Sequence, residues 1–185
     1  MSVVAPTRLR RFLDALYALS GAVAACCLAG ICVVMLAQVA GREAGVLLRG
    51  ADDITAWLCA ASAFFALAHT FRRAELVRMM LVVDRLNPRA RVRMEAAALG
   101  IAALFTGFMA WSVTRFVYES WQFNEMAQGL LKIPIWIPQL SFVLGVWVFF
   151  IAVVDELMSV LSGHAPAYRL AEDERRRRGD FSETL

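Results

Sequence analysis

Four long apolar runs constrain the fold of this chain more than any other feature. They cover residues 12–41, 54–72, 94–117 and 135–161. A helix needs about 20 apolar residues to cross the hydrocarbon core of a bilayer, and each run reaches or approaches that length. The whole chain is 60% hydrophobic, whereas soluble domains are about 45–50% apolar. The sequence therefore predicts an all-α integral membrane protein with four transmembrane helices.

Arginine and lysine are distributed unevenly among the connecting segments. When Arg72 and Arg115, at the edges of their runs, are counted with the neighbouring connectors, the N-terminal segment, the connector between the second and third runs, and the C-terminal tail together hold fifteen of them. The other two connectors hold four. Cytoplasmic loops of membrane proteins retain Lys and Arg, so both termini should be cytoplasmic. This divides the chain into an N-terminal cytoplasmic segment (1–11), a membrane domain (12–162) and a polar cytoplasmic tail (163–185).

The connector between the second and third runs is the most basic segment, with seven arginines between residues 72 and 93. Over residues 74–87, Glu75, Arg78 and Arg85 share one helical face, and apolar residues cover the remainder. A wide apolar face with a narrow charged stripe is typical of a helix half-buried at a membrane surface. We therefore expect an interfacial arm helix over 74–87 that contacts anionic phospholipids. A plain cytoplasmic helical hairpin is the alternative.

Prolines mark the starts of the third and fourth helices. Asn87-Pro88 has the pattern of an N-cap followed by the first helical residue, where proline is favoured. Pro134 and Pro138 indicate an irregular approach to the fourth helix, and Trp136 between them suits the aromatic belt at the membrane interface.

Ionisable residues are missing from the centres of the four runs. Asp155 and Glu156 lie near one end of the fourth run, and His69 lies near the end of the second; we expect them to reach the interface. A membrane haem carrier needs axial histidines inside its bundle, and a proton-coupled exporter needs an embedded carboxylate. All four cysteines lie in apolar runs, which disfavours a disulfide framework or a zinc site. No catalytic residue, metal, cofactor or nucleic-acid partner is expected.

Polar residues gather where the first run ends and the second begins. Gln38 and Arg42 share a face near the end of the first run, and Asp52 and Asp53 precede the second. An Arg42–Asp53 ion pair could tie the first two helices together. Unrelated charges at the membrane interface are the alternative.

Several motifs across residues 12–162 form one recognisable set. They are Arg42, Asp53, Arg72-Arg73, Val77-Arg78, Asp84-Arg85-Leu86-Asn87-Pro88, Leu131-Lys132-Ile133-Pro134-Ile135-Trp136-Ile137-Pro138 and Gly145. Taken together, these motifs resemble the small membrane subunit, of the DctQ type, of tripartite ATP-independent periplasmic (TRAP) transporters.

The resemblance implies a non-catalytic scaffold in a bacterial inner membrane. Its implied partners are a large membrane subunit, which holds the transport and sodium sites, and a periplasmic binding protein for a small organic acid. The residues expected to anchor the scaffold to its partner and to lipid are Arg42, Asp53, Arg72, Arg73, Arg78, Arg85, Pro134, Trp136 and Pro138. The residues expected to contact the binding protein are Glu119, Gln122, Glu125 and Lys132. The alternative is a stand-alone four-helix protein, such as a small exporter or an assembly factor.

Overall fold

The structure of the protein is a computed structural model. It describes residues 8–72 and 88–162. Within these ranges the chain forms four long helices and an isolated β-bridge between Met126 and Pro134. The helices are α1 (Arg8–Glu43), α2 (Ala51–Arg72), α4 (Pro88–Gln122) and α5 (Trp136–Leu161). All four are long and apolar enough to cross a membrane. This confirms the predicted all-α class with four spans. The arm helix expected over 74–87 lies outside the described residues.

The helices begin and end where local chemistry dictates. α4 begins at Pro88, and α5 carries Pro138 in its first turn, where a missing N–H costs no helical hydrogen bond. After α1, Gly45 adopts a φ of 74°, and after α4, Asn124 adopts a φ of 48°. These left-handed residues end the helical path. α1 and α4 have 36 and 35 residues, about 50 Å at 1.5 Å per residue, which exceeds a hydrocarbon core of about 30 Å.

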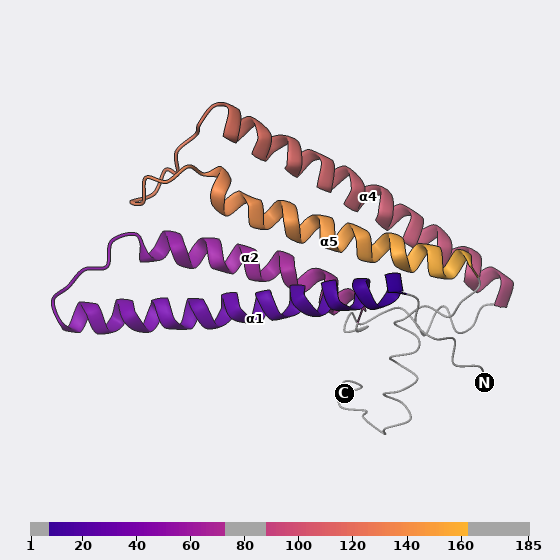
Figure 1. Ribbon diagram of the computed structural model, residues 1–185, viewed down its shortest axis with the longest axis horizontal. Helices are drawn as coiled ribbons and strands as arrows, with labels where there is room; N and C mark the ends of the chain where they lie inside the picture. Colours follow the sequence, from indigo (N-terminus) through magenta and orange to yellow (C-terminus); the bar gives the residue numbers. More distant parts are fainter. Residues whose placement is uncertain (1–7, 73–87, 163–185) are drawn as a thin grey trace, which may run out of the picture.

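The helices form two hairpins that lie side by side in one layer (Figure 1). α2 and α5 pack against each other in the middle, and α1 and α4 flank them. We call the end that holds residues 44–50 and 123–135 the loop end, and the opposite end the terminal end. Both central helices run from the loop end to the terminal end, so they are parallel neighbours from different hairpins.

Close backbone contact defines the seam between α2 and α5. A Cβ added at Gly145 would lie 2.7 Å from the Cβ of Phe64 and 2.9 Å from its carbonyl carbon. On either side, Phe64 meets Phe142 edge-on with ring centroids 4.8 Å apart, and Phe71 meets Phe149 at 5.6 Å. Glycine thus allows the two backbones to approach, and aromatic pairs fill the space along the contact.

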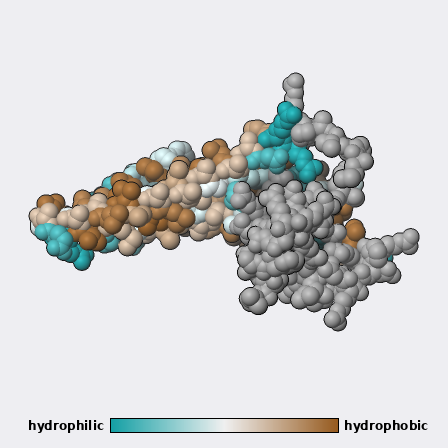
Figure 2. All heavy atoms as spheres, turned by 90° about the horizontal axis from the view of Figure 1, so that it is seen from below, coloured by the Kyte–Doolittle hydropathy of each residue, from teal (hydrophilic) through white to brown (hydrophobic). Residues whose placement is uncertain are grey.

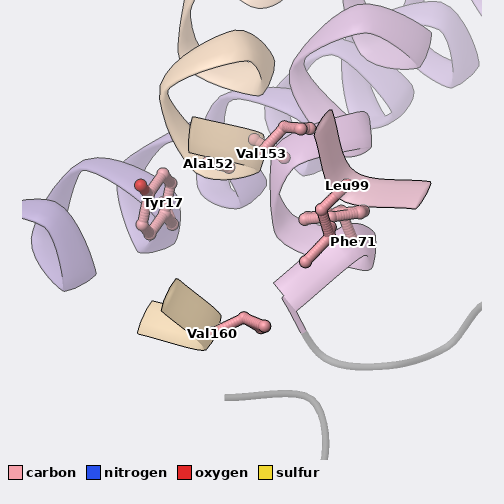
Figure 3. Close-up of a cluster of buried hydrophobic side chains, with 7 residues drawn as sticks. Tyr17, Phe71, Leu99, Ala152, Val153 and Val160 are labelled. Atoms are coloured by element: carbon pink, nitrogen blue, oxygen red, sulfur yellow. The ribbon is translucent and has the colours of Figure 1, made fainter. Parts of the chain in front are cut away.

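A buried cluster near the terminal end joins all four helices (Figure 3). Tyr17 comes from α1, Phe71 from α2 and Leu99 from α4, and they meet Val153 and Val160 of α5. The two hairpins are therefore packed together by side chains from every helix at this end. Ala68 and Ala152 complete the cluster.

The outer helices expose large apolar side chains along their length. On α4, Leu104, Phe105 and Phe108 are each about 70% exposed, and α1 presents Val33 and Leu36. Seen from the α1 side, hydrophobic atoms cover the middle of the molecule and hydrophilic ones gather toward its ends (Figure 2). Contiguous apolar surface of this extent marks contact with lipid or with another protein.

Replacing Gly145 with alanine should destabilise the protein. The added methyl must displace the backbone of Phe64, and overpacking of this kind costs about 1–3 kcal/mol. Thermal unfolding of the purified protein in detergent should therefore show a lower midpoint. Gly100→Ala is the matched control, because no heavy atom lies within 4 Å of its added Cβ. Equal midpoints for the two variants would contradict the close seam.

Candidate functional site

The loop end gathers most of the residues that the sequence singles out. It comprises the two loops, 44–50 and 123–135, and the helix ends that adjoin them. The predicted residues found there are Arg42, Asp53, Glu119, Gln122, Glu125, Lys132, Pro134, Trp136 and Pro138.

A polar contact links α1 to α2 at this end, but not the expected one. Gln38 donates from Nε2 to Oδ1 of Asp52 over 2.9 Å. Arg42 is exposed, and its backbone carbonyl accepts a hydrogen bond from the amide of Gly45 at 3.1 Å. The expected Arg42–Asp53 ion pair is absent from the contacts of these two described residues. Asp53 lies on the same turn as Asp52 but is engaged by another part of the chain.

Asp53 joins α2 to the loop between α4 and α5. Its Oδ2 accepts hydrogen bonds from the backbone amides of Leu130 at 2.9 Å and Leu131 at 3.3 Å. Successive amides that point at one oxygen form a concave anion site, here filled by a carboxylate of the same chain. Gly129 precedes these amides, and a Cβ on it would collide with both carboxylate oxygens. The contact therefore depends on Asp53 and on the absence of a side chain at residue 129.

Apolar packing accompanies this contact. Gly50, with a φ of 85°, is buried directly beneath the side chain of Leu131. A Cβ at Gly50 would lie 2.5 Å from Cγ of Leu131. Asp53 stands in the first turn of α2, three residues later, where the free N–H groups of the helix favour negative charge. The loop after α4 thus meets the first turn of α2 through the Asp53 carboxylate, and it meets Gly50 just before that turn through the Leu131 side chain.

The loop after α4 is also folded upon itself. The amide of Ala127 donates to the carbonyl of Ile133 at 2.9 Å, and the amide of Ile135 donates to the carbonyl of Glu125 at 3.0 Å. The carboxylate of Glu125 accepts a hydrogen bond from the hydroxyl of buried Ser120 at 2.9 Å. These bonds close the loop between α4 and α5 into a narrow hairpin-like turn.

The approach to α5 follows the pattern of its prolines. The carbonyl of Pro134 accepts a hydrogen bond from the amide of Ile137 at 3.2 Å. The carbonyl of Pro138 accepts one from the hydroxyl of Ser141 at 2.7 Å. Trp136, the first residue of α5, is half-buried. Pro138 thus lies in the first turn of α5 and Pro134 lies just before it. No hydrogen bond within the helix needs a backbone N–H at either position.

Charged side chains and apolar side chains are both exposed on this loop and on the end of α4. Nε of Arg115 lies 3.2 Å from Oε1 of Glu119, and both side chains are largely exposed. Gln122 and Lys132 are exposed as well, as is Leu130. The loop end therefore presents a mixed polar and apolar surface. Within residues 8–72 and 88–162, no three His, Cys, Asp or Glu side chains are grouped so that they could hold a metal ion.

The terminal end holds the other predicted residues. Arg72 is the last residue of α2. Arg73, Arg78 and Arg85 lie outside the described residues. Glu156 is 3% exposed, so the expectation that it reaches the interface is wrong.

His69 bridges α1 and α2 near the same end. Its Nδ1 lies 3.2 Å from the carbonyl oxygen of Tyr17. Its ring also lies over Gly21, where a Cβ would approach Nδ1 to 2.7 Å. The histidine therefore takes part in helix packing, and its half-buried side chain is held between two helices.

Some important residues gave no sign in the sequence. Gly129 and Gly50 look like ordinary loop glycines, and Leu130 and Leu131 contribute backbone amides that residue type does not reveal. Asp53 was singled out, but its partners lie 77 and 78 residues away. A glycine inside a loop can mark a close approach of two backbone segments, but this pattern alone does not single out Gly129.

Comparison with known proteins agrees with this architecture. The family model described as the DctQ component of tripartite ATP-independent periplasmic transporters matches residues 31–163. That range includes the last third of α1 and all of α2, α4 and α5. No curated protein matches the chain. Because the match spans well over half of the sequence, the chain belongs to the DctQ family of components of tripartite ATP-independent periplasmic transporters.

Proposed function

We propose that this chain is the scaffold subunit of a sodium-coupled TRAP importer for a small organic acid. In this role it binds the large membrane subunit, which carries the transport and sodium sites, and helps to dock the periplasmic solute-binding protein. Family membership supports the assignment. The structural observation that supports it most is the arrangement of four long helices in one layer.

A single layer suits a scaffold for a simple geometric reason. A compact bundle hides most of its helix surface, whereas here α1 and α4 flank a central pair and expose most of their apolar side chains. Such a layer has a broad surface that a partner and lipid can share. When a transport domain moves through the membrane, a wide and well-anchored neighbour resists tilting more than a narrow one.

The orientation that we propose places the loop end in the periplasm and the terminal end in the cytoplasm of a bacterial inner membrane. The distribution of Arg and Lys supports this orientation. The charged surface around Glu119, Gln122, Glu125 and Lys132 then faces the binding protein. Arg72, Arg73, Arg78 and Arg85 face the anionic cytoplasmic leaflet, where each basic residue contributes about 1 kcal/mol of attraction.

Co-purification tests the assignment directly. The tagged chain, expressed with its genomic neighbours and extracted in mild detergent, should retain a large multi-span membrane protein. Reconstituted with that partner and a binding protein, it should support sodium-dependent uptake of an organic acid. A chain that purifies as a functional homo-oligomer, with no large partner, would contradict the proposal and favour the stand-alone alternative.

Neutralising Arg72, Arg73 and Arg78 together should weaken anchoring. The Gln triple variant loses about 3 kcal/mol of attraction to anionic lipid, so we expect less assembled complex in the membrane or slower uptake. The Lys triple variant is the matched control, because it keeps all three charges. Normal co-purification and normal uptake by the Gln variant would contradict a role for these arginines.

Reversing charge at Glu119 and Lys132 should impair docking of the binding protein. Both side chains are exposed at the loop end, so Glu119→Lys and Lys132→Glu should reduce binding-protein-dependent uptake. Glu119→Gln should have a smaller effect than Glu119→Lys. Co-purification with the large subunit should stay normal, which separates docking from assembly. Unchanged uptake in both reversal variants would contradict the proposal that this surface docks the binding protein.

A further inference from the structure

We propose that Asp53 is a positioning residue: it holds the loop over residues 123–135 against the first turn of α2 and so presents that loop preformed to the solute-binding protein. The holding contact is visible in the structure. The benefit for docking rests on the proposed function. This role differs from the ion pair between helices that the sequence suggested for Asp53.

The geometry around the carboxylate favours a tight and specific contact. A single oxygen of Asp53 receives two successive amides, 2.9 and 3.3 Å away. Hydrogen bonds to an ionised acceptor are about twice as strong as neutral ones. The same carboxylate lies in the first turn of α2, where the helix dipole also stabilises negative charge. Partial positive charge therefore reaches Asp53 from two elements that are far apart in the sequence.

The loop has little apolar burial of its own to hold it in place. Phe123 and Leu130 are 72% exposed and Met126 is 53% exposed, whereas Ala127 is buried. Its internal hydrogen bonds close it into a turn but do not connect it to the α1–α2 hairpin. That connection comes from Asp53 and from the packing of Leu131 on Gly50. Loss of the carboxylate should therefore free the loop while the helices remain packed.

A preformed loop binds more tightly than one that must become ordered. Fixing the backbone of even one residue lowers an association constant by about tenfold. Because two successive amides are fixed by Asp53, removal of the carboxylate should weaken docking by about tenfold or more. Side chains that touch the binding protein can stay unchanged in this case. The expected defect is therefore in affinity and arises without loss of a direct contact.

Hydrogen exchange in the assembled membrane complex tests the holding contact by itself. In Asp53→Asn and in Gly129→Ala, the amides of Leu130 and Leu131 should exchange about tenfold faster or more than in the wild type. Asp52→Asn is the matched control, because Asp52 is the adjacent carboxylate and bonds to Gln38 instead. Unchanged exchange in both test variants would overturn the holding contact. The Gly129 variant keeps the test valid if Asp53→Asn fails to assemble.

Affinity of the complex for its purified binding protein then tests the positioning role. We expect about tenfold weaker binding for Asp53→Asn and Gly129→Ala, and wild-type binding for Asp52→Asn. Faster exchange with unchanged affinity would overturn the positioning role. If Glu119→Lys and Lys132→Glu also left affinity unchanged, the proposed docking surface would be wrong as well. If those reversals did weaken binding, the docking surface would stand and the role of Asp53 alone would fall.

Discussion

The close contact between α2 and α5 is the interaction on which the rest of the structure depends. Each hairpin alone would be two helices with mostly lipid-facing surfaces. In a bilayer, apolar helices gain little from the hydrophobic effect when they associate, because lipid tails are as apolar as their side chains. Close packing has to supply the attraction. Gly145 permits it by letting the backbone of α5 reach that of Phe64, and two edge-on phenylalanine pairs extend the contact.

Each end of the seam is fixed by a different kind of interaction. Near the terminal end, side chains from all four helices form one apolar cluster, which includes Tyr17 and Val153. At the loop end, the Asp53 carboxylate and the Leu131 side chain tie α2 to the loop before α5. The layer is therefore tied by apolar packing at one end and mainly by hydrogen bonds at the other. Such an arrangement suits a subunit whose proposed task is to stay still.

The sequence predicted those features of the fold that depend on the pattern of neighbouring residues, namely the spans and one helix start. The lengths of the apolar runs predicted four spans, and Asn87-Pro88 predicted the residue at which α4 begins. It did not predict that α2 and α5 are the central, parallel pair. Small residues occur throughout the chain, and Gly145, although it belongs to the motifs that carry the family resemblance, does not reveal which helix it meets. The sequence also suggested Arg42 as the partner of Asp53, since partners close in sequence are easier to foresee than backbone amides 77 residues away.

Glu156 shows a further limit of pattern-based reasoning. A carboxylate near the end of a span normally extends to the interface, and the sequence was interpreted in that way. Its burial follows from which face of α5 meets the other helices, and Val153 and Val160 lie on that face with it. Which face of α5 is buried depends on how the other helices pack against it, so the residue pattern of α5 alone could not have revealed that Glu156 is buried.

A distance measurement between the two hairpins tests whether this chain is a fixed scaffold. Spin labels at Leu47 and Phe123, both exposed and one on each loop, would report their separation within the reconstituted transporter. Cys26, Cys27, Cys32 and Cys59 are free and would first be replaced with alanine. A fixed scaffold keeps the same distance distribution with and without sodium and loaded binding protein. A shift of the whole distribution by several ångströms during transport would contradict a fixed scaffold.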